Sequence, residues 1–227
     1  MISTANNRIA LRAGLFGMLA TSMLAANLPN PAADEGRPEA KSETVVLAGG
    51  CFWGVQAVYS ASKGVLSAVS GYAGGSKANA HYEIVSTGTT GHAESVQITF
   101  DPAQISFGQL LKIYFSVVHD PTELNRQGPD EGTQYRSEIF YTSEEQKRIA
   151  EGYIQQLGAA KVFSRPIVTK VAPLQAFYRA EDYHQDYVLH CQQNSPSCTN
   201  ARYVAYNDVP KLASFKQSFP QLVKGAK

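Results

Sequence analysis

Cys51 has the clearest capacity for chemistry in this sequence, because a predicted strand ends just before it and a predicted helix begins just after it. Residues 44–48 form a short apolar, β-branched run, Gly49 and Gly50 interrupt it, and apolar residues at helical spacing follow. A helix N-terminus carries partial positive charge and free N–H groups, so this position favours a thiolate. The alternative is a structural cysteine, because free cysteine is among the residue types most often buried.

Two bulky apolar residues follow this cysteine directly. They are Phe52 and Trp53, and Trp53 is the only tryptophan in the chain. Large apolar side chains beside a nucleophile can form the wall of a pocket for a small apolar group. They can equally belong to the hydrophobic core, which the helical spacing alone favours.

Composition and motifs exclude several classes of function. The 227 residues include 20 Lys and Arg against 19 Asp and Glu, so no basic field is available to hold a nucleic acid. The five histidines are scattered, and the chain contains neither H-E-x-x-H nor C-x-x-C, so we expect no metal site. No G-x-G-x-x-G motif is in place for a nucleotide, and we expect no cofactor.

The rest of the chain alternates predicted strands and helices, with long loops between them. Apolar and alternating runs predict strands over residues 65–72, 95–100, 137–142 and 167–172. Apolar residues every three or four positions, or helix-start signals, predict helices over 107–118, 144–157, 181–190 and 211–219. Ser143 and Gln146 read as a capping box. We therefore expect a single α+β or α/β domain from about residue 44 onward.

The N-terminal residues have the features of an export signal. Residues 1–33 contain no Asp or Glu, Arg8 and Arg12 are their only charged residues, and 13–28 are mostly apolar. The apolar run is short for a membrane span, which takes ~20 residues. Residues 29–43 are rich in Pro, Ala and charge, which is typical of a disordered linker.

We accordingly divide the chain into a signal peptide (1–33), a linker (34–43), one domain (44–220) and a tail (221–227). The protein is then exported to the periplasm or another extracytoplasmic space. A retained membrane anchor and an organelle transit peptide are the alternatives.

The pentapeptide Gly50-Cys51-Phe52-Trp53-Gly54 resembles the active-site motif of the peptide methionine sulfoxide reductase A (MsrA) family. Further blocks match that family in the same order, at residues 70–75, 82–94, 119–137 and 180–185. The resemblance covers about residues 44–220. It implies an α+β fold, a single-domain α/β sandwich with a mixed sheet, a ferredoxin-like core and a long C-terminal coil.

The resemblance implies an enzyme that returns the S-epimer of methionine sulfoxide, free or in proteins, to methionine without a cofactor. It implies that Cys51 attacks the sulfoxide sulfur and keeps the oxygen as a sulfenic acid, while the Glu94 carboxyl supplies a proton. It also implies a monomer and a set of substrate-binding residues. These are Phe52 and Trp53 for the S-methyl group, Tyr82 and Tyr135 for the sulfoxide oxygen, and Asp130 for water and substrate.

The two remaining cysteines bear on how such an enzyme is regenerated. Cys191 and Cys198 lie in a polar stretch that departs from a familiar cysteine-containing ending of the family. The run from Tyr203 to Lys211 instead resembles another family ending, one often without a resolving cysteine.

A sulfenic acid is cleared by condensing with another thiol, and the disulfide would then be reduced by a thioredoxin-like protein. We expect Cys198 to supply that thiol, because its Asn, Ser and Pro neighbours allow it to move. Cys191, which follows a predicted helix, ranks second. A purely structural Cys191–Cys198 disulfide is the third alternative.

Two other kinds of protein fit the same residues. A different thiol enzyme, such as a thiol peroxidase, would also use Cys51. A non-catalytic module would bind oxidised methionine through Phe52 and Trp53 without consuming a reductant.

Overall fold

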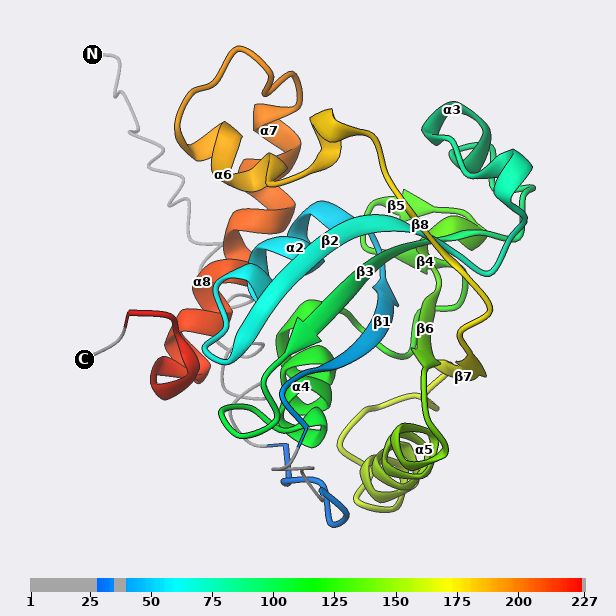
Figure 1. Cartoon of the computed structure of the whole chain (residues 1–227), viewed down its shortest axis with the longest axis vertical. Coiled ribbons are helices and arrows are strands. Elements are labelled where there is room, and N and C mark those ends of the chain that lie inside the picture. The colour runs from blue at the N-terminus through cyan, green and yellow to red at the C-terminus, as the bar shows by residue number, and fades with distance from the viewer. Residues whose placement is uncertain (1–27, 35–39, 226–227) are drawn as a thin grey trace, which may run out of the picture.

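The computed structural model describes residues 28–34 and 40–225. These residues form an α+β fold around a six-stranded mixed sheet with the strand order β7-β6-β1-β3-β2-β8 (Figure 1). The strands of this sheet are β1 (Glu43–Gly49), β2 (Val65–Ala73), β3 (Ala93–Phe100), β6 (Ser137–Tyr141), β7 (Lys170–Pro173) and β8 (Phe177–Arg179). A separate two-stranded ribbon consists of β4 (Arg126–Gln127) and β5 (Asp130–Glu131).

The central strands β1 and β3 bring Cys51 and the predicted acid, Glu94, to the same end of the sheet. β1 pairs antiparallel with β3 and with β6, whereas β6 and β7 run parallel. The end of β1 therefore lies beside the start of β3. Residues 45–49 and 93–96 are buried, as expected for strands in the interior of a sheet.

Helices cover one face of this sheet. The α-helices are α2 (Phe52–Ser60), α3 (Tyr82–Val85), α4 (Phe107–Ile113), α5 (Glu144–Ala159), α6 (Tyr187–Gln192), α7 (Ala201–Tyr203) and α8 (Val209–Ser218). α2 packs against β2 and β3 and, on its other side, against α8 (Figure 1). Because strand side chains alternate between faces, Val45 and Leu47 join the main apolar core, whereas Val46 and Ala48 join a smaller cluster on the opposite face.

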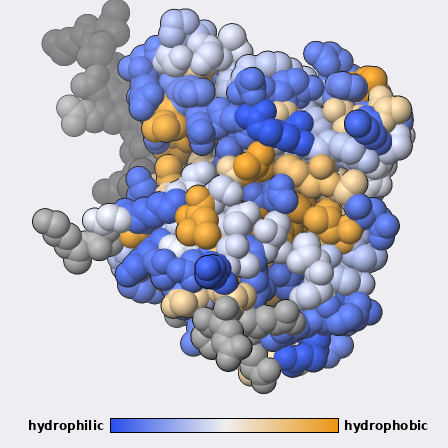
Figure 2. Space-filling view, in the orientation of Figure 1, coloured by the Kyte–Doolittle hydropathy of each residue, from blue (hydrophilic) through white to orange (hydrophobic). Residues whose placement is uncertain are grey.

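The surface is mostly polar on the face turned toward the viewer, with small apolar clusters between hydrophilic residues (Figure 2). Large exposed hydrophobic side chains include Leu66, Leu124 and Tyr206. Within the described residues, no helix is long and apolar enough to cross a membrane.

The helices predicted over 181–190 and 211–219 are present as α6 and α8, but the expected long C-terminal coil is wrong. Residues 182–222 instead contain α6, α7 and α8 together with the short helical turns η4 (Asp182–His184), η5 (Val204–Asp208) and η6 (Pro220–Leu222). The segment is ordered because it buries apolar side chains, among them Val204 and Phe215, against the main core. The helix predicted over 107–118 is present as α4 followed by a π-helical turn, η2 (Tyr114–Val118).

The expected disorder is also wrong for residues 29–34, which form a packed strap across α4 and α5. The Tyr153 hydroxyl donates to the Pro29 carbonyl at 2.8 Å, and Leu28 is buried. The Asp34 carboxylate accepts from the Gly108 backbone N–H at 2.9 Å, at the start of α4. The apolar part of the predicted signal peptide falls mainly on residues 1–27, which lie outside the described residues.

Candidate active site

Cys51 lies between β1 and α2, where it is the N-cap residue of α2. The preceding Gly50 has a φ of +87°, a left-handed conformation that other residues rarely adopt. A Cβ at this position would also lie 2.6 Å from Cγ of Gln127. Glycine is therefore required for the sharp turn that delivers Cys51 from the strand to the helix, and the predicted strand–glycine–helix arrangement is confirmed.

A cavity of about 160 Å³ opens beside Cys51. Its lining residues are Cys51, Phe52, Trp53, Tyr82, Glu94, Asp130, Tyr135, Asn200 and Tyr203. The first seven of these are the residues that the sequence singled out for the nucleophile, the acid and the substrate pocket, so the fold brings all of them to one place. Asn200 and Tyr203 were not predicted, and Cys191 and Cys198 are not among the lining residues.

Glu94 is the second residue of β3 and is almost completely buried. The backbone N–H of Phe52 donates a hydrogen bond of 3.1 Å to its Oε2 atom. Burial nevertheless raises the pKa of Glu94 to about 8, and the negative charges of Asp130 and Asp208 add to this effect. The carboxyl is therefore mostly protonated at neutral pH, which is the form that a proton donor needs.

Burial likewise raises the pKa of the Cys51 thiol well above its ordinary value, and the Glu94 and Asp208 carboxyls raise it further. The backbone N–H of Trp53 in the first turn of α2 lowers it, but by less. The helix N-terminus thus acts in the predicted direction, but burial outweighs it, so the net shift in the pKa of Cys51 is upward. Desolvation is the largest of these effects, and negative charge on Glu94 or Asp208 adds to it.

The apolar wall of the cavity is formed by Phe52 and Trp53, both buried in the first turn of α2. The indole Nε1–H of Trp53 donates to Nδ1 of His184 at 3.0 Å. Burial lowers the pKa of His184 to about 4, so its ring is neutral and can accept this bond. Phe52 and Trp53 thus belong to the packed interior and line the cavity at the same time.

Two phenol groups face the same cavity. Tyr82 begins α3, and Tyr135 ends the short turn η3 (Thr133–Tyr135). Burial raises the pKa of Tyr82 to about 12 and that of Tyr135 further still, with the Glu94 carboxyl contributing in both cases. Both hydroxyls therefore keep their protons and are available as hydrogen-bond donors.

Asp130 reaches the cavity from the β4–β5 ribbon and is tied to the C-terminal segment. The Tyr203 hydroxyl donates a hydrogen bond to its Oδ2 atom. Burial raises the pKa of Asp130, while this hydrogen bond lowers it. Tyr203 also stands edge-on to Trp53, with ring centroids 5.9 Å apart, so it joins the polar and apolar parts of the lining.

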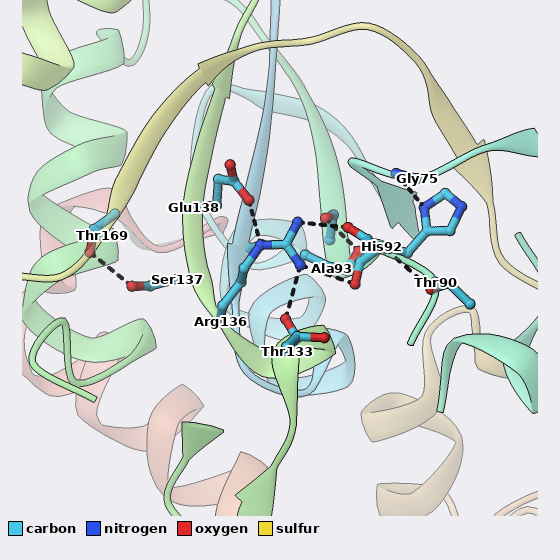
Figure 3. Close-up of polar contacts among 12 residues, drawn as sticks. Gly75, Thr90, His92, Ala93, Thr133, Arg136, Ser137, Glu138 and Thr169 are labelled. Atoms are coloured by element: carbon cyan, nitrogen blue, oxygen red, sulfur yellow. Dashed lines mark hydrogen bonds and ion pairs between the residues drawn. The ribbon is translucent and has the colours of Figure 1, made fainter. Parts of the chain in front are cut away.

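Arg136 fastens together the two segments that carry Glu94 and Tyr135 (Figure 3). Its guanidinium donates to the carbonyls of His92 at 3.1 Å and Thr133 at 2.9 Å, and pairs with Glu138 at 2.6 Å. Both carbonyl partners lie two residues before a lining residue. A largely buried ion pair with several hydrogen bonds has one preferred geometry. Arg136 therefore fixes the position of Glu94 relative to Tyr135.

Asp208 is a buried carboxyl that the sequence did not predict. It is fully buried at the end of η5, and neither carboxyl oxygen has a hydrogen-bond partner. An added Cβ at Gly54 would collide with its Oδ1 atom, so the second glycine of the pentapeptide makes room for it. Burial raises the pKa of Asp208 to about 7. The run from Tyr203 to Lys211 is the sequence signal that points to Tyr203 and Asp208.

Cys191 and Cys198 form a disulfide with their Cα atoms 4.9 Å apart, whereas Cys51 is free. A structural bridge, the third of the expected alternatives, leads to this pairing directly. Resolution of Cys51 by Cys198 leads to it only if the bridge is then passed on to Cys191. Within residues 28–34 and 40–225, no three His, Cys, Asp or Glu side chains are grouped so that they could hold a metal ion.

Comparisons with known proteins agree on one family. The sequence model described as peptide methionine sulfoxide reductase matches residues 43–220. The peptide methionine sulfoxide reductase MsrA 2 of Mesorhizobium japonicum is 56% identical over 181 residues, which cover 80% of this chain and 89% of that protein.

Two solved structures are also similar. The reduced form of Mxr1 from Saccharomyces cerevisiae has a TM-score of 0.63 and 31% identity, and the match covers 73% of this chain and 95% of that one. Methionine sulfoxide reductase A of Corynebacterium diphtheriae has a TM-score of 0.56 and 33% identity, covering 71% and 84%. The resemblance carried by the motifs is thereby confirmed, and the chain belongs to the peptide methionine sulfoxide reductase family, as a peptide-methionine (S)-S-oxide reductase of the MsrA class.

Proposed function

We propose that Cys51 and Glu94 together reduce methionine sulfoxide in this protein, with Cys51 as the nucleophile and Glu94 as the acid. The observation that carries the proposal is that a buried thiol and a protonated carboxyl share one cavity, whose wall is apolar at Phe52 and Trp53. A sulfoxide oxygen leaves sulfur readily only after protonation. The neutral carboxyl supplies that proton without help from a metal ion.

In the proposed first step, the Cys51 sulfur bonds to the substrate sulfur while Glu94 protonates the sulfoxide oxygen. The thiol proton of Cys51 replaces the one that Glu94 gives. The oxygen then passes to the Cys51 sulfur: an S–O bond to Cys51 forms, the substrate S–O bond and the new S–S bond break, and methionine leaves, with Cys51 now a sulfenic acid. The substrate sulfur gains the two electrons that the Cys51 sulfur loses, and no proton is gained or lost overall.

The other lining residues bind the substrate in this proposal. Phe52 and Trp53 receive the S-methyl group, because their rings form the apolar part of the cavity. The protonated hydroxyls of Tyr82 and Tyr135 donate to the sulfoxide oxygen as its negative charge grows. Asp130 holds water and the polar part of the substrate, at the orientation that the Tyr203 hydroxyl gives it.

Regeneration proceeds through Cys198 and then Cys191. The Cys198 thiol condenses with the Cys51 sulfenic acid to give a Cys51–Cys198 disulfide and water. Cys191 then attacks the Cys198 sulfur, which leaves a Cys191–Cys198 disulfide and a free Cys51. That pairing, and the position of Asn200 in the cavity lining two residues beyond Cys198, support the route. A thioredoxin-like protein is the proposed reductant of the final disulfide.

The chain is exported in this proposal, and its leader is removed before Leu28. The contacts of the strap support this position, because the carbonyl of Asn30 accepts from Gln156 at 2.8 Å and its side chain accepts from Lys112 at 2.8 Å. Cleavage near Ala33 would remove these contacts, whereas cleavage after Ala26 would keep them. The mass of the exported protein tests this point, and a mature chain that begins at Asp34 would contradict it.

The four inner strands follow a ferredoxin-like plan in this proposal, and the protein acts as a monomer. The chain order β1-α2-β2-β3-α4-β6 together with the spatial order β6-β1-β3-β2 supports the first point. The second is what the resemblance to the family implies.

Trapping of the sulfenic acid tests the roles of the cysteines. A variant with Cys191→Ser and Cys198→Ser receives one equivalent of an S-sulfoxide peptide together with dimedone, which captures sulfenic acids. We expect one methionine per chain and a dimedone adduct on Cys51. With Cys51→Ser added, both products should disappear. Methionine release above about one per cent of the parent rate in that variant would contradict a nucleophilic Cys51.

A further inference from the structure

Tyr187, the first residue of α6, connects the wall of the cavity to the segment that carries Cys198. It is buried, and its ring stacks on the indole of Trp53, with ring centroids 3.9 Å apart and an interplanar angle of 15°. The ring therefore packs behind the residue that faces the substrate.

The hydroxyl of Tyr187 collects hydrogen bonds from the residues that directly follow Cys198. The backbone N–H groups of Thr199 and Asn200 each donate to it at 3.0 Å, and the Asn200 side-chain amide donates at 3.3 Å. The Thr199 hydroxyl is a further partner at 3.2 Å. Burial alone would raise the pKa of Tyr187, but the hydrogen bonds from these donors together outweigh it, so the pKa is lowered. A cluster of donors on one buried oxygen is a specific anchor for a segment that is otherwise rich in turn residues.

Tyr187 and Cys191 stand four residues apart on α6 and so share one face of that helix. Cys191 is bonded to Cys198, and Tyr187 is bonded to the two residues after it. The segment 198–200 is therefore docked on α6 at two points about one turn apart. One of these points is the covalent bond, which opens in each cycle of the proposed route, whereas the other consists of hydrogen bonds that involve no sulfur atom.

We propose that Tyr187 is a positioning residue for the disulfide relay, and that its hydroxyl keeps residues 198–200 docked on α6 while the Cys191–Cys198 bond is open. This inference rests on the proposed function for the route through Cys198. In the relay step, the Cys191 thiolate attacks the Cys198 sulfur of the Cys51–Cys198 disulfide, the Cys191–Cys198 bond forms and Cys51 leaves as a thiolate that takes up a proton. The step exchanges one disulfide for another, so no external oxidant is needed. By holding the two sulfurs near each other, Tyr187 raises the effective concentration of Cys191 toward Cys198.

The equilibrium between the Cys191–Cys198 disulfide and glutathione measures that effective concentration directly. We would titrate it in the full chain with Cys51→Ser, which leaves only these two thiols, and compare Tyr187→Phe with the unchanged residue. The phenylalanine keeps the ring on Trp53 and removes only the acceptor. We expect the equilibrium constant for closing the disulfide to fall about tenfold, which corresponds to a potential about 30 mV less negative.

Tyr206→Phe is the matched control, because Tyr206 lies in the same C-terminal segment and is 73% exposed. Its potential should equal that of the parent. Thr199→Ala is a graded variant, which loses one side-chain partner but keeps both backbone donors, so its shift should be smaller than that of Tyr187→Phe. An unchanged potential in Tyr187→Phe, or an equal shift in Tyr206→Phe, would overturn the proposal.

Tyr187→Phe in the protein that retains Cys51 tests the transfer of the disulfide from Cys51 to Cys191. After one equivalent of substrate, Tyr187→Phe should accumulate the Cys51–Cys198 disulfide, detectable by peptide mass mapping, because its transfer to Cys191 is slower. If the unsubstituted protein never forms a Cys51–Cys198 disulfide, the proposed recycling route fails. The glutathione titration still decides the role of Tyr187 in that case, so the two failures are distinguishable.

Discussion

The backbone N–H of Phe52 donates a 3.1 Å hydrogen bond to Oε2 of Glu94, so the residue next to the nucleophile holds the acid. The two residues are 42 positions apart in the sequence and meet because β1 and β3 are antiparallel neighbours. The bond fixes the orientation of the carboxyl, yet burial keeps its pKa at about 8. Glu94 is thereby both fixed in position and protonated.

Asp208 should control how readily Cys51 ionises. Because burial raises the pKa of Asp208 to about 7, its negative charge develops as the pH rises through 7 and then raises the pKa of the Cys51 thiol further. Asp130 and Lys211 act on Asp208 in opposite directions. We expect Asp208→Asn to speed the alkylation of Cys51 by iodoacetamide above pH 7 and to leave it unchanged well below pH 7.

Asp182→Asn is the control for this measurement, because Asp182 is exposed and pairs with Arg179 at the surface. Its alkylation profile should match that of the parent. Equal profiles for Asp208→Asn and the parent at every pH would show that Asp208 does not act on Cys51.

Trp53 should set the size of the group that the cavity accepts. Trp53→Ala would remove a buried ring that packs on Tyr187, at a cost of ~3–5 kcal/mol in the free energy of unfolding. A loss of activity in that variant would then not distinguish an unstable protein from an altered pocket. Trp53→Phe keeps an aromatic ring but loses the hydrogen bond to His184. We expect kcat/KM to fall for methyl sulfoxides and to fall less for bulkier S-alkyl sulfoxides. An unaltered ratio between the two substrates would argue that Trp53 is only a core residue.

Cys198 should be needed for regeneration and not for the reduction itself. Cys198→Ser should release one equivalent of methionine at the parent rate, because Cys51 alone performs that step. It should then fail to turn over with thioredoxin, which reduces protein disulfides, while turnover with dithiothreitol persists. Full thioredoxin-dependent turnover in Cys198→Ser would make the Cys191–Cys198 disulfide a structural bridge.

The location of the candidate site could be predicted from the sequence, because its main residues lie in contiguous motifs. Gly50 to Gly54 form one such motif, and the backbone turn at Gly50 needs the glycine that the sequence provides. The charge state of Cys51 could not be predicted. Its pKa is raised first by burial and then by Glu94 and Asp208, which approach Cys51 only through the pairing of β3 and the packing of the C-terminal segment.

The capping boxes at two helix N-termini show the same limit of prediction from sequence. The predicted capping box at Ser143 is only half formed, because the Gln146 side chain accepts from the Thr142 N–H instead of returning to the N-cap residue. A complete box is present at Ser106 and Gln109, where no box was predicted. The sequence contains the required residue types in both places, but competing backbone donors decide which rotamer the glutamine adopts.

The pH dependence of the first turnover tests the central claim, that Glu94 donates the proton, most directly. The acid form of Glu94 is present below its pKa of about 8 and is lost above it, whereas Cys51 remains a thiol because its own pKa is raised. Single-turnover release of methionine should therefore be constant at neutral pH and fall as the pH rises through 8. In Glu94→Gln it should be slower by ~10²–10⁴-fold and lack this inflection. A parent rate that stays constant through pH 8, or a Glu94→Gln rate equal to that of the parent, would contradict the account.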